Sequence, residues 1–292
     1  MEAAELLKRV RRVEITSRGL SDRIFAGEYS SAFKGRGMAF SENREYQAGD
    51  EVRTIDWNVT ARTRTPHVKV FEEERELTVF LLIDMSASLR GGTKDRTLND
   101  LVTEVSAVLA FSAMGNNDKV GAILFTDRIE RFIPPAKGKS HVLRIIRDLL
   151  ECQPVGDRSD IAKALTHFST AMRKRTVSFL ISDFKAIPDD AELATLLKRT
   201  RRRHDLVALH VRDPLDDALP AMGWVMVENP ETATSTWVRS GKRAVRDAWS
   251  KQGQAHATEL SQMMRKAGVD TAMLSTEGSF VQPLLKLFHA RK

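Results

Sequence analysis

The apolar positions from residue 77 onward follow two alternating patterns. Short continuous apolar runs predict strands buried on both faces, at Leu77–Ile83, Lys119–Phe125, Thr176–Ser182, Leu206–Val211 and Val269–Leu274. Segments with apolar residues at helical spacing lie between and after them, at Leu98–Met114, His141–Leu150, Ile161–Met172, Ala191–Arg201, Lys242–Lys266 and Val281–Phe288. Such alternation predicts an α/β fold with a doubly wound, mostly parallel sheet.

Two further segments of this region have the pattern of antiparallel pairs. Arg128–Ile133 follows a tight Thr126-Asp127 turn and can pair with the preceding strand. Trp224–Glu228 and Thr232–Val238 are separated by Asn229-Pro230, which predicts a hairpin.

The first 76 residues follow a different pattern. Gly35, Gly37 and Gly49-Asp50 are turn signals, and short strands are expected at Met38–Phe40, Val52–Ile55 and Val68–Phe71. We therefore expect two domains: a β-rich appendage of residues 1–76, packed on the sheet domain, and the α/β domain of residues 77–292.

Composition limits the class of protein. The chain is 42% hydrophobic and 29% charged, as in ordinary globular proteins. Its single cysteine, Cys152, excludes an internal disulfide framework. The N-terminus lacks a signal-peptide pattern, and the most apolar stretch, Leu77–Leu89, is too short to span a bilayer. We expect a cytoplasmic protein without a transmembrane segment, and its net charge of +7 suits acidic partners.

Polar side chains occur where predicted strands end or helices begin. Asp84, Ser86 and Ser88 follow one buried strand, Asp183 follows another, and Ser159 opens a helix. Open α/β sheets bind ligands at the carboxyl ends of their strands, so these side chains are expected to converge. Oxygen ligands of this kind suit Mg²⁺, with Mn²⁺ or Ca²⁺ as alternatives. The competing interpretation is local, because Ser and Asp after a strand also cap helices.

The Asp84-Met85-Ser86-Ala87-Ser88 loop resembles the metal-ion-dependent adhesion site of von Willebrand factor A domains. The resemblance implies that Asp84, Ser86 and Ser88 form the first metal loop and Asp183 the third. Ser159 stands where the family's second loop usually has threonine. A metal held mainly by hydroxyls could bind a carboxylate of another protein, which implies a binding function without catalysis.

The segment upstream of this loop resembles the bacterial family called domain of unknown function fifty-eight. The matching residues are Gly37, Phe40, Glu42, Arg44, Tyr46, Gly49, Asp50, Arg53, Ile55, Asp56, Trp57, Ala61, Arg62, Lys69 and Phe71. This resemblance implies a MoxR-type AAA+ ATPase as partner, because such proteins are commonly encoded beside these ATPases.

Two other functions remain as alternatives. An aspartate after a first strand could accept a phosphoryl group in a metal-dependent phosphohydrolase, although Ser86 stands where such enzymes have a second aspartate. The positive charge could serve a nucleic-acid-binding protein, but no aromatic-basic motif accompanies it, so no nucleic acid is expected. We therefore expect a protein that is not an enzyme.

Two charged clusters have structural explanations that we prefer. The set Glu42, Arg44, Asp50, Arg53, Asp56 and Arg62 is expected to be a salt-bridge network, with Trp57 as a packing anchor. The run Lys198–Arg203 is expected to be the solvated basic end of a helix.

Overall fold

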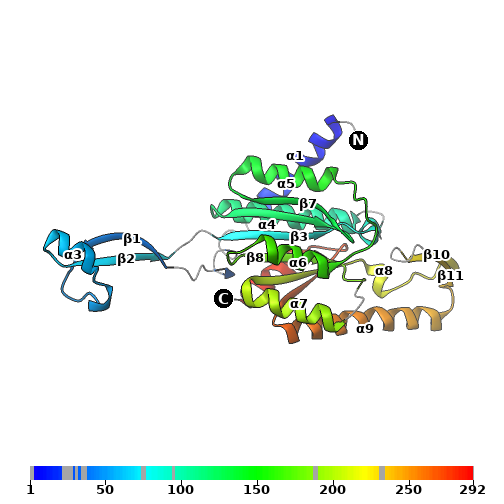
Figure 1. Cartoon of the computed structure of the whole chain (residues 1–292). Coiled ribbons are helices and arrows are strands. Elements are labelled where there is room, and N and C mark those ends of the chain that lie inside the picture. Colours follow the sequence, from blue (N-terminus) through cyan, green and yellow to red (C-terminus); the bar gives the residue numbers. More distant parts are fainter. Residues whose placement is uncertain are drawn as a thin grey trace. The chain divides into compact units, whose positions relative to one another are not determined.

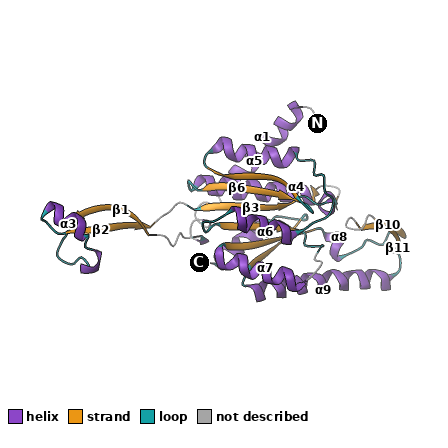
Figure 2. Cartoon of the chain, in the orientation of Figure 1, coloured by secondary structure: helices purple, strands orange, loops and turns teal. Residues whose placement is uncertain are grey.

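The fold is described here from a computed structural model, which covers residues 3–21, 29, 32–33, 38–73, 77–93, 96–186, 190–229 and 234–291. The chain forms two compact units (Figures 1 and 2). The sheet unit comprises residues 1–32 and 78–292, and the small unit comprises residues 33–77.

The sheet unit is built on a six-stranded sheet in the order β12-β9-β8-β3-β6-β7. Five strands are parallel: β3 (Thr78–Asp84), β6 (Lys119–Phe125), β8 (Val177–Ser182), β9 (Asp205–Arg212) and β12 (Asp270–Ser275). The edge strand β7 (Ile129–Ala136) is antiparallel to β6. The chain builds the sheet outward from β3 through β6 and β7, then returns to β8 and builds the other half. This confirms the predicted doubly wound, mostly parallel sheet.

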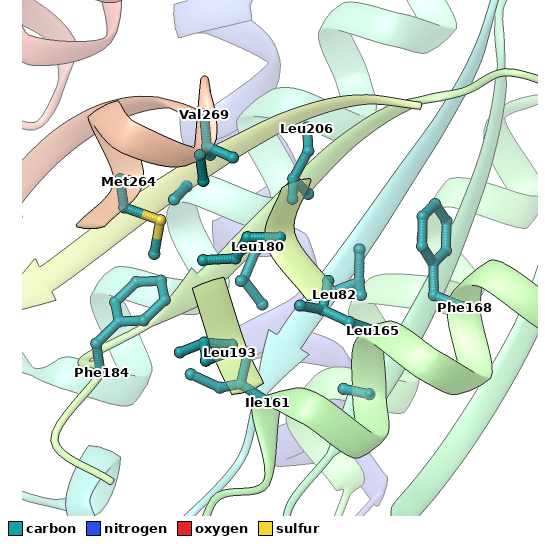
Figure 3. Close-up of a cluster of buried hydrophobic side chains, with 14 of the residues drawn as sticks. Leu82, Ile161, Leu165, Phe168, Leu180, Phe184, Leu193, Leu206, Met264 and Val269 are labelled. Atoms are coloured by element: carbon teal, nitrogen blue, oxygen red, sulfur yellow. The ribbon is translucent and has the colours of Figure 1, made fainter. Parts of the chain in front are cut away.

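Helices cover both faces of this sheet. The three helices α6 (Ile161–Ala171), α7 (Asp190–Arg203) and α9 (Arg243–Ala267) share one hydrophobic cluster with the strands. Figure 3 shows Leu82, Leu180 and Leu206 from three neighbouring strands among side chains of these helices. The helix α4 (Leu98–Gly115) contacts β3 and β6, α5 (Lys139–Glu151) packs beside it, and α10 (Val281–His289) contacts β12. Central strands buried on both faces explain the continuous apolar runs of the sequence.

The N-terminal helix α1 (Ala3–Leu20) belongs to the sheet unit, where it contacts α4 and α5. Ser112 of α4 donates a hydrogen bond to the hydroxyl of Ser21, and Lys139 Nζ lies 2.6 Å from Glu14 Oε1. Grouping all of residues 1–76 into one β-rich appendage therefore differs from the observed division. The helix α1 contacts two helices of the sheet unit, and the small unit is confined to residues 33–77.

The small unit is an antiparallel pair with a helical connection. β1 (Met38–Glu45) pairs with β2 (His67–Glu73), as expected for Met38–Phe40 and Val68–Phe71. The strand expected at Val52–Ile55 is wrong: Val52–Thr54 is a 3-10 turn, η2, and Ile55 makes only an isolated bridge. The reason is local, because Asp56 caps α3 (Trp57–Thr63) and turns the chain into that helix. The turn signals Gly35 and Gly37 lie outside the described residues.

Ion pairs within the small unit account for part of the expected charged network. Arg44 donates two hydrogen bonds to the Asp50 carboxylate, at 2.7 and 2.8 Å, and this pairing lowers the pKa of Asp50. Asp56 caps α3 and lies 3.6 Å from Lys69 Nζ. Trp57 is 68% exposed, so its assignment as a packing anchor is wrong.

Between β9 and α9 the chain forms a short helix and a hairpin. The helix α8 (Pro214–Asp217) comes first, and β10 (Trp224–Asn229) then pairs with β11 (Thr234–Arg239). The predicted hairpin is confirmed. Thr232, where its second strand was expected to begin, lies outside the described residues. The basic run Lys198–Arg203 is the C-terminal part of α7, as predicted. None of the helices in the described segments is long and apolar enough to cross a membrane.

Candidate functional site

The strands β3 and β8 lie side by side at the point where the strand order of the sheet reverses. Their parallel pairing places Ile83 opposite Ile181, so both strands end at the same edge. Asp84 is the last residue of β3, and Asp183 directly follows β8. This is the position where doubly wound sheets bind ligands.

The Asp84 carboxylate is fully buried and surrounded by hydrogen-bond donors. Its Oδ1 accepts a bond from the backbone N–H of Ser86 at 2.9 Å. Its Oδ2 accepts bonds from the hydroxyls of Ser159 at 2.7 Å and Ser182 at 2.6 Å. Ser182 is not among the residues predicted from the sequence, because it reads there as an ordinary strand position. Only the pairing of β3 with β8 brings it to Asp84.

The loop after β3 places two hydroxyls together. Ser86 Oγ and Ser88 Oγ lie 3.1 Å apart, and both side chains are buried. Backbone bonds fix the loop from two sides, since Met85 N donates to the carbonyl of Phe125 and Ala87 N to that of Asp157, each at 2.8 Å. The loop that carries Ser86 and Ser88 is thus tied to the segment that carries Ser159.

The segment before α6 carries Ser159, and its backbone at Gly156 lies close to side chains of the β6–β7 region. Glu130 Oε1 accepts hydrogen bonds from Thr126 Oγ1 at 2.7 Å and from the backbone N–H of Gly156 at 2.9 Å. A Cβ atom on Gly156 would lie 2.3 Å from Thr126 Oγ1 and 2.0 Å from Asp127 Oδ1. Only glycine fits here without displacement, so Gly156 is part of what positions Ser159.

Asp183 is buried beside this cluster and its Oδ2 atom has no hydrogen-bond partner among the described residues. The next residue, Phe184, has the left-handed backbone conformation with φ of 52°, which is unfavourable for a non-glycine residue. Two contacts stabilise it. The N–H of Phe184 donates to Ser182 Oγ at 3.0 Å, and its buried ring meets that of His210 edge-on at 5.7 Å. Strain of this kind, held by surrounding packing, is typical of functional sites.

Burial disfavours the charged forms of both carboxylates, and repulsion by Asp84 adds to this effect at Asp183. Burial raises the pKa of Asp84, against the opposing effect of its hydroxyl and amide donors. Burial and then the nearby Asp84 raise the pKa of Asp183 to about 6, while Lys185 and the Ser88 hydroxyl act in the other direction. A positive ion between these carboxylates would relieve both effects.

Lys185 lies at the edge of the site and is a second residue that sequence reasoning missed. Its Nζ is 3.8 Å from Asp183 Oδ2 and 2.8 Å from Asp216 Oδ1. These three residues line a pocket of about 250 Å³ together with His210, Arg212, Trp249, Gln252, Gly253 and His256. The pocket lies between the ends of β8 and β9 and the helices α8 and α9. Burial, followed by the charge of Arg212, lowers the pKa of His210 to about 3, so this ring is neutral.

The structure brings all five predicted site residues together. Asp84 contacts Ser86 and Ser159, Ser86 contacts Ser88, and the Ser88 hydroxyl interacts with Asp183. Oxygen donors of this type fit a hard divalent cation such as Mg²⁺. Across the described part of the chain, no group of three or more His, Cys, Asp or Glu side chains is arranged to hold a metal ion. A metal here would therefore depend on the serine hydroxyls as well as on Asp84 and Asp183.

The sequence pattern of the family described as protein of unknown function DUF58 matches residues 42–259. The chain belongs to this family. A relative of this DUF58 protein in Mycobacterium tuberculosis strain H37Rv, uncharacterized protein Rv1480, is 30% identical over 292 residues, which cover 99% of this chain and 90% of the relative. Uncharacterized protein MAV169 of Mycobacterium avium is 25% identical over 162 residues, covering 55% of this chain and 94% of the relative.

Solved structures resemble this DUF58 protein in fold. The conserved hypothetical protein BatB from Bacteroides thetaiotaomicron superimposes with a TM-score of 0.50 at 12% identity, over 74% of this chain and 98% of BatB. The SpRpn10 VWA domain gives a TM-score of 0.42 at 13% identity, over 74% of this chain and 95% of that domain. The sheet unit is von Willebrand factor A-like: its six strands have the doubly wound order, and the DxSxS loop follows the central strand β3.

Proposed function

We propose that this DUF58 protein is a metal-dependent protein-interaction module without catalytic activity. In this proposal Asp84, Ser86, Ser88, Ser159 and Asp183 hold one divalent cation, with Mg²⁺ preferred over Mn²⁺ and Ca²⁺. Ser182 orients Asp84 by its hydrogen bond and is a positioning residue.

The observation that carries the proposal is the pair of buried carboxylates at the switch point of the sheet. Isolated carboxylates are costly to bury, and such groups in proteins are usually paired or bound to a metal. Here Asp183 Oδ2 has no hydrogen-bond donor within the described residues, and the ammonium group of Lys185 is 3.8 Å away from it. A divalent cation would neutralise both carboxylates and use the hydroxyls as further ligands.

When bound, the cation would supply a Lewis-acidic centre that accepts one more oxygen ligand. Among the proposed ligands only the two carboxylates carry charge, so the complex would be close to neutral and would keep a coordination position open for one more oxygen ligand. We propose that a Glu or Asp side chain of another protein is this ligand. The net charge of +7 would attract an acidic surface toward the site.

The partner that we propose is a MoxR-type AAA+ ATPase, which follows from the family resemblance. Surface plasmon resonance between the full chain and the ATPase encoded nearest to it tests the proposal, with Mg²⁺ and then with EDTA. We expect binding that requires the metal and is lost in Asp84→Ala and Asp183→Ala. Glu151→Ala is the matched control, because Glu151 is an acidic residue of α5 that pairs with Arg147 of its own helix. An affinity that is the same in EDTA would contradict the role of this site.

Isothermal titration with Mg²⁺ separates the metal site from the choice of partner. We expect Asp84→Ala to abolish Mg²⁺ binding in a folded protein and Ser159→Ala to weaken it less, because serine supplies one neutral ligand. A parallel assay with a generic phosphoester and Mg²⁺ is expected to show no hydrolysis. Turnover that depends on Asp84 would favour the phosphohydrolase alternative instead.

A further inference from the structure

The hairpin of β10 and β11 carries large apolar side chains on one face. Trp224, Met226 and Trp237 are 62%, 60% and 64% exposed. Met226 pairs directly with Trp237, and Trp224 pairs with Arg239, so these side chains share one face of the two-stranded sheet. The guanidinium of Arg239 lies 5.8 Å from the centre of the Trp224 ring. We call this set the Trp/Met face.

Such a face is unusual on a protein surface. Single exposed apolar residues are common, but neighbouring large ones mark interaction sites. Tryptophan, methionine and arginine are also the residues enriched at protein interfaces, and tryptophan and arginine dominate the binding energy there. The Trp/Met face is therefore suited to fill an apolar groove of another molecule.

The charges around the Trp/Met face indicate what that molecule is. Residues 234–246 contain four basic side chains and no acidic one: Arg239, Lys242, Arg243 and Arg246. They lie at the base of the hairpin and complement an acidic rim. Glu228 is on the same face, opposite Ser235. Its carboxylate opposes approach to an anionic lipid surface, so the distribution of charge favours a protein.

The hairpin lies at the same end of the sheet unit as the candidate metal site (Figure 1). It is inserted between α8 and α9, in the connection that leaves the carboxyl end of β9. The pocket beside the site reaches the two helices that flank the hairpin in the sequence, because Asp183 lines it together with Asp216 of α8 and Trp249 of α9. Trp249 also ties these helices together, since its Nε1 donates to the carbonyl of Leu215 at 2.8 Å.

We infer that the Trp/Met face is a second docking surface for the protein whose carboxylate completes the metal site. That protein presents an apolar groove with an acidic rim beside its metal-binding carboxylate. This inference rests on the proposed function for the identity of the partner. The metal contact provides dependence on the cation, and the hairpin provides apolar contact area that does not depend on it.

The test uses the full chain and the MoxR-type ATPase as the probe. The double variant Trp224→Ser/Trp237→Ser is expected to bind the ATPase at least tenfold more weakly, with unchanged Mg²⁺ affinity and melting temperature. Trp57→Ser is the matched control, because Trp57 is equally exposed but lies in the small unit. The charge variant Lys242→Glu/Arg243→Glu is expected to slow association, and this effect should decrease as salt is added.

The outcomes separate the two proposals. Metal-dependent binding that is equally tight in the double variant overturns the hairpin surface and leaves the metal function standing. Binding that is insensitive to EDTA but lost in the double variant overturns the metal function and retains the hairpin as a docking surface. No binding to the ATPase in any nucleotide state overturns the ATPase as the partner and the hairpin surface with it, whereas the metal site is then decided by the Mg²⁺ titration. Co-sedimentation with phosphatidylglycerol vesicles that is lost in the double variant, without any effect on ATPase binding, would replace the protein partner with a lipid surface.

Discussion

Ser182 Oγ donates a 2.6 Å hydrogen bond to Asp84 Oδ2, so the last residue of β8 holds the carboxylate at the end of β3. The same oxygen also accepts the hydroxyl of Ser159 at 2.7 Å. Two hydroxyls on one oxygen fix the orientation of the carboxylate before any ligand arrives. The switch point of the sheet is therefore organised by side chains from three separate segments.

The first prediction concerns Ser182 as a positioning residue. Ser182→Ala removes one donor to Asp84 and should weaken Mg²⁺ affinity by about 10- to 100-fold, the usual effect of losing a group that orients a metal ligand. Isothermal titration measures this change. Ser275→Ala is the matched control, because Ser275 also ends a parallel strand and accepts the N–H two residues later, from Glu277. Equal Mg²⁺ affinity in Ser182→Ala and wild type would contradict the positioning role.

Ser182 is also an example of a site residue that the sequence alone does not predict. The strands β3 and β8 were predictable because continuous apolar residues indicate a buried strand. Asp84 and Asp183 were predictable because they are charged residues at the ends of these strands. Ser182 carries no such signal. Its role depends on which strands are neighbours and in what register, and neither is encoded locally. The same holds for Lys185 and the pocket, which arise from the packing of α8 and α9 beside β9.

The Val52–Ile55 segment illustrates a different failure. Its β-branched residues favour a strand, but a nearby aspartate can compete by accepting backbone N–H groups. Asp56 accepts those of Asn58 and Val59 and begins α3. The capping preference of aspartate prevailed over β propensity in a segment too short to form a ladder.

The second prediction uses the raised pKa of Asp183. The folded protein binds the Asp183 proton more tightly than the unfolded chain, because its pKa is about 6 instead of the ordinary 3.8. This side chain therefore stabilises the metal-free protein at low pH, and the contribution is lost as the pH rises through 6. Asp183→Asn should thus be more stable than wild type by about 1–3 kcal/mol at pH 7.5 in EDTA, and the difference should shrink toward pH 4.

Urea unfolding of both proteins at a series of pH values measures this difference. His204 and His210, whose pKa values are lowered to about 4 and about 3, destabilise the protein on acidification, but they are present in both proteins and cancel. Mg²⁺ should raise the stability of wild type at pH 7.5 and leave Asp183→Asn unchanged. A variant that is less stable than wild type at pH 7.5 without metal would show that burial of the Asp183 charge is not costly.

The third prediction concerns Gly156. In Gly156→Ala the new methyl group would overlap Thr126 Oγ1 and Asp127 Oδ1, so the segment before α6 must move and carry Ser159 away from Asp84. We expect a loss of about 1–3 kcal/mol in stability and weaker Mg²⁺ binding. Thermal unfolding and Mg²⁺ titration are the measurements. Gly115→Ala is the control, because nothing lies within 4 Å of a Cβ atom there. If Gly156→Ala kept the melting temperature and the Mg²⁺ affinity of wild type, the segment would adapt to the methyl group without moving Ser159.

The fourth prediction concerns the division of the chain into two units. The strand pairing places Met38 opposite Glu73, so the ends of the small unit are neighbours and a short Gly/Ser linker can replace residues 38–73. Such a chain retains α1 and the whole hydrophobic cluster of the sheet unit. We expect its sheet unit to keep its melting temperature and its Mg²⁺ affinity. A large drop in melting temperature would show that the small unit packs on the sheet unit, as the sequence led us to expect.

A chain that begins at Thr78 provides the contrasting case. It lacks the small unit and also α1, whose removal uncovers the surfaces of α4 and α5 that it contacts. It also leaves Ser112 without the Ser21 hydroxyl and Lys139 without Glu14. We therefore expect lower solubility and a lower melting temperature than in the linker variant, with increased binding of a hydrophobic dye. If both shortened chains melted at the same temperature, α1 would contribute nothing to the stability of the sheet unit, and its assignment to that unit would have to be abandoned.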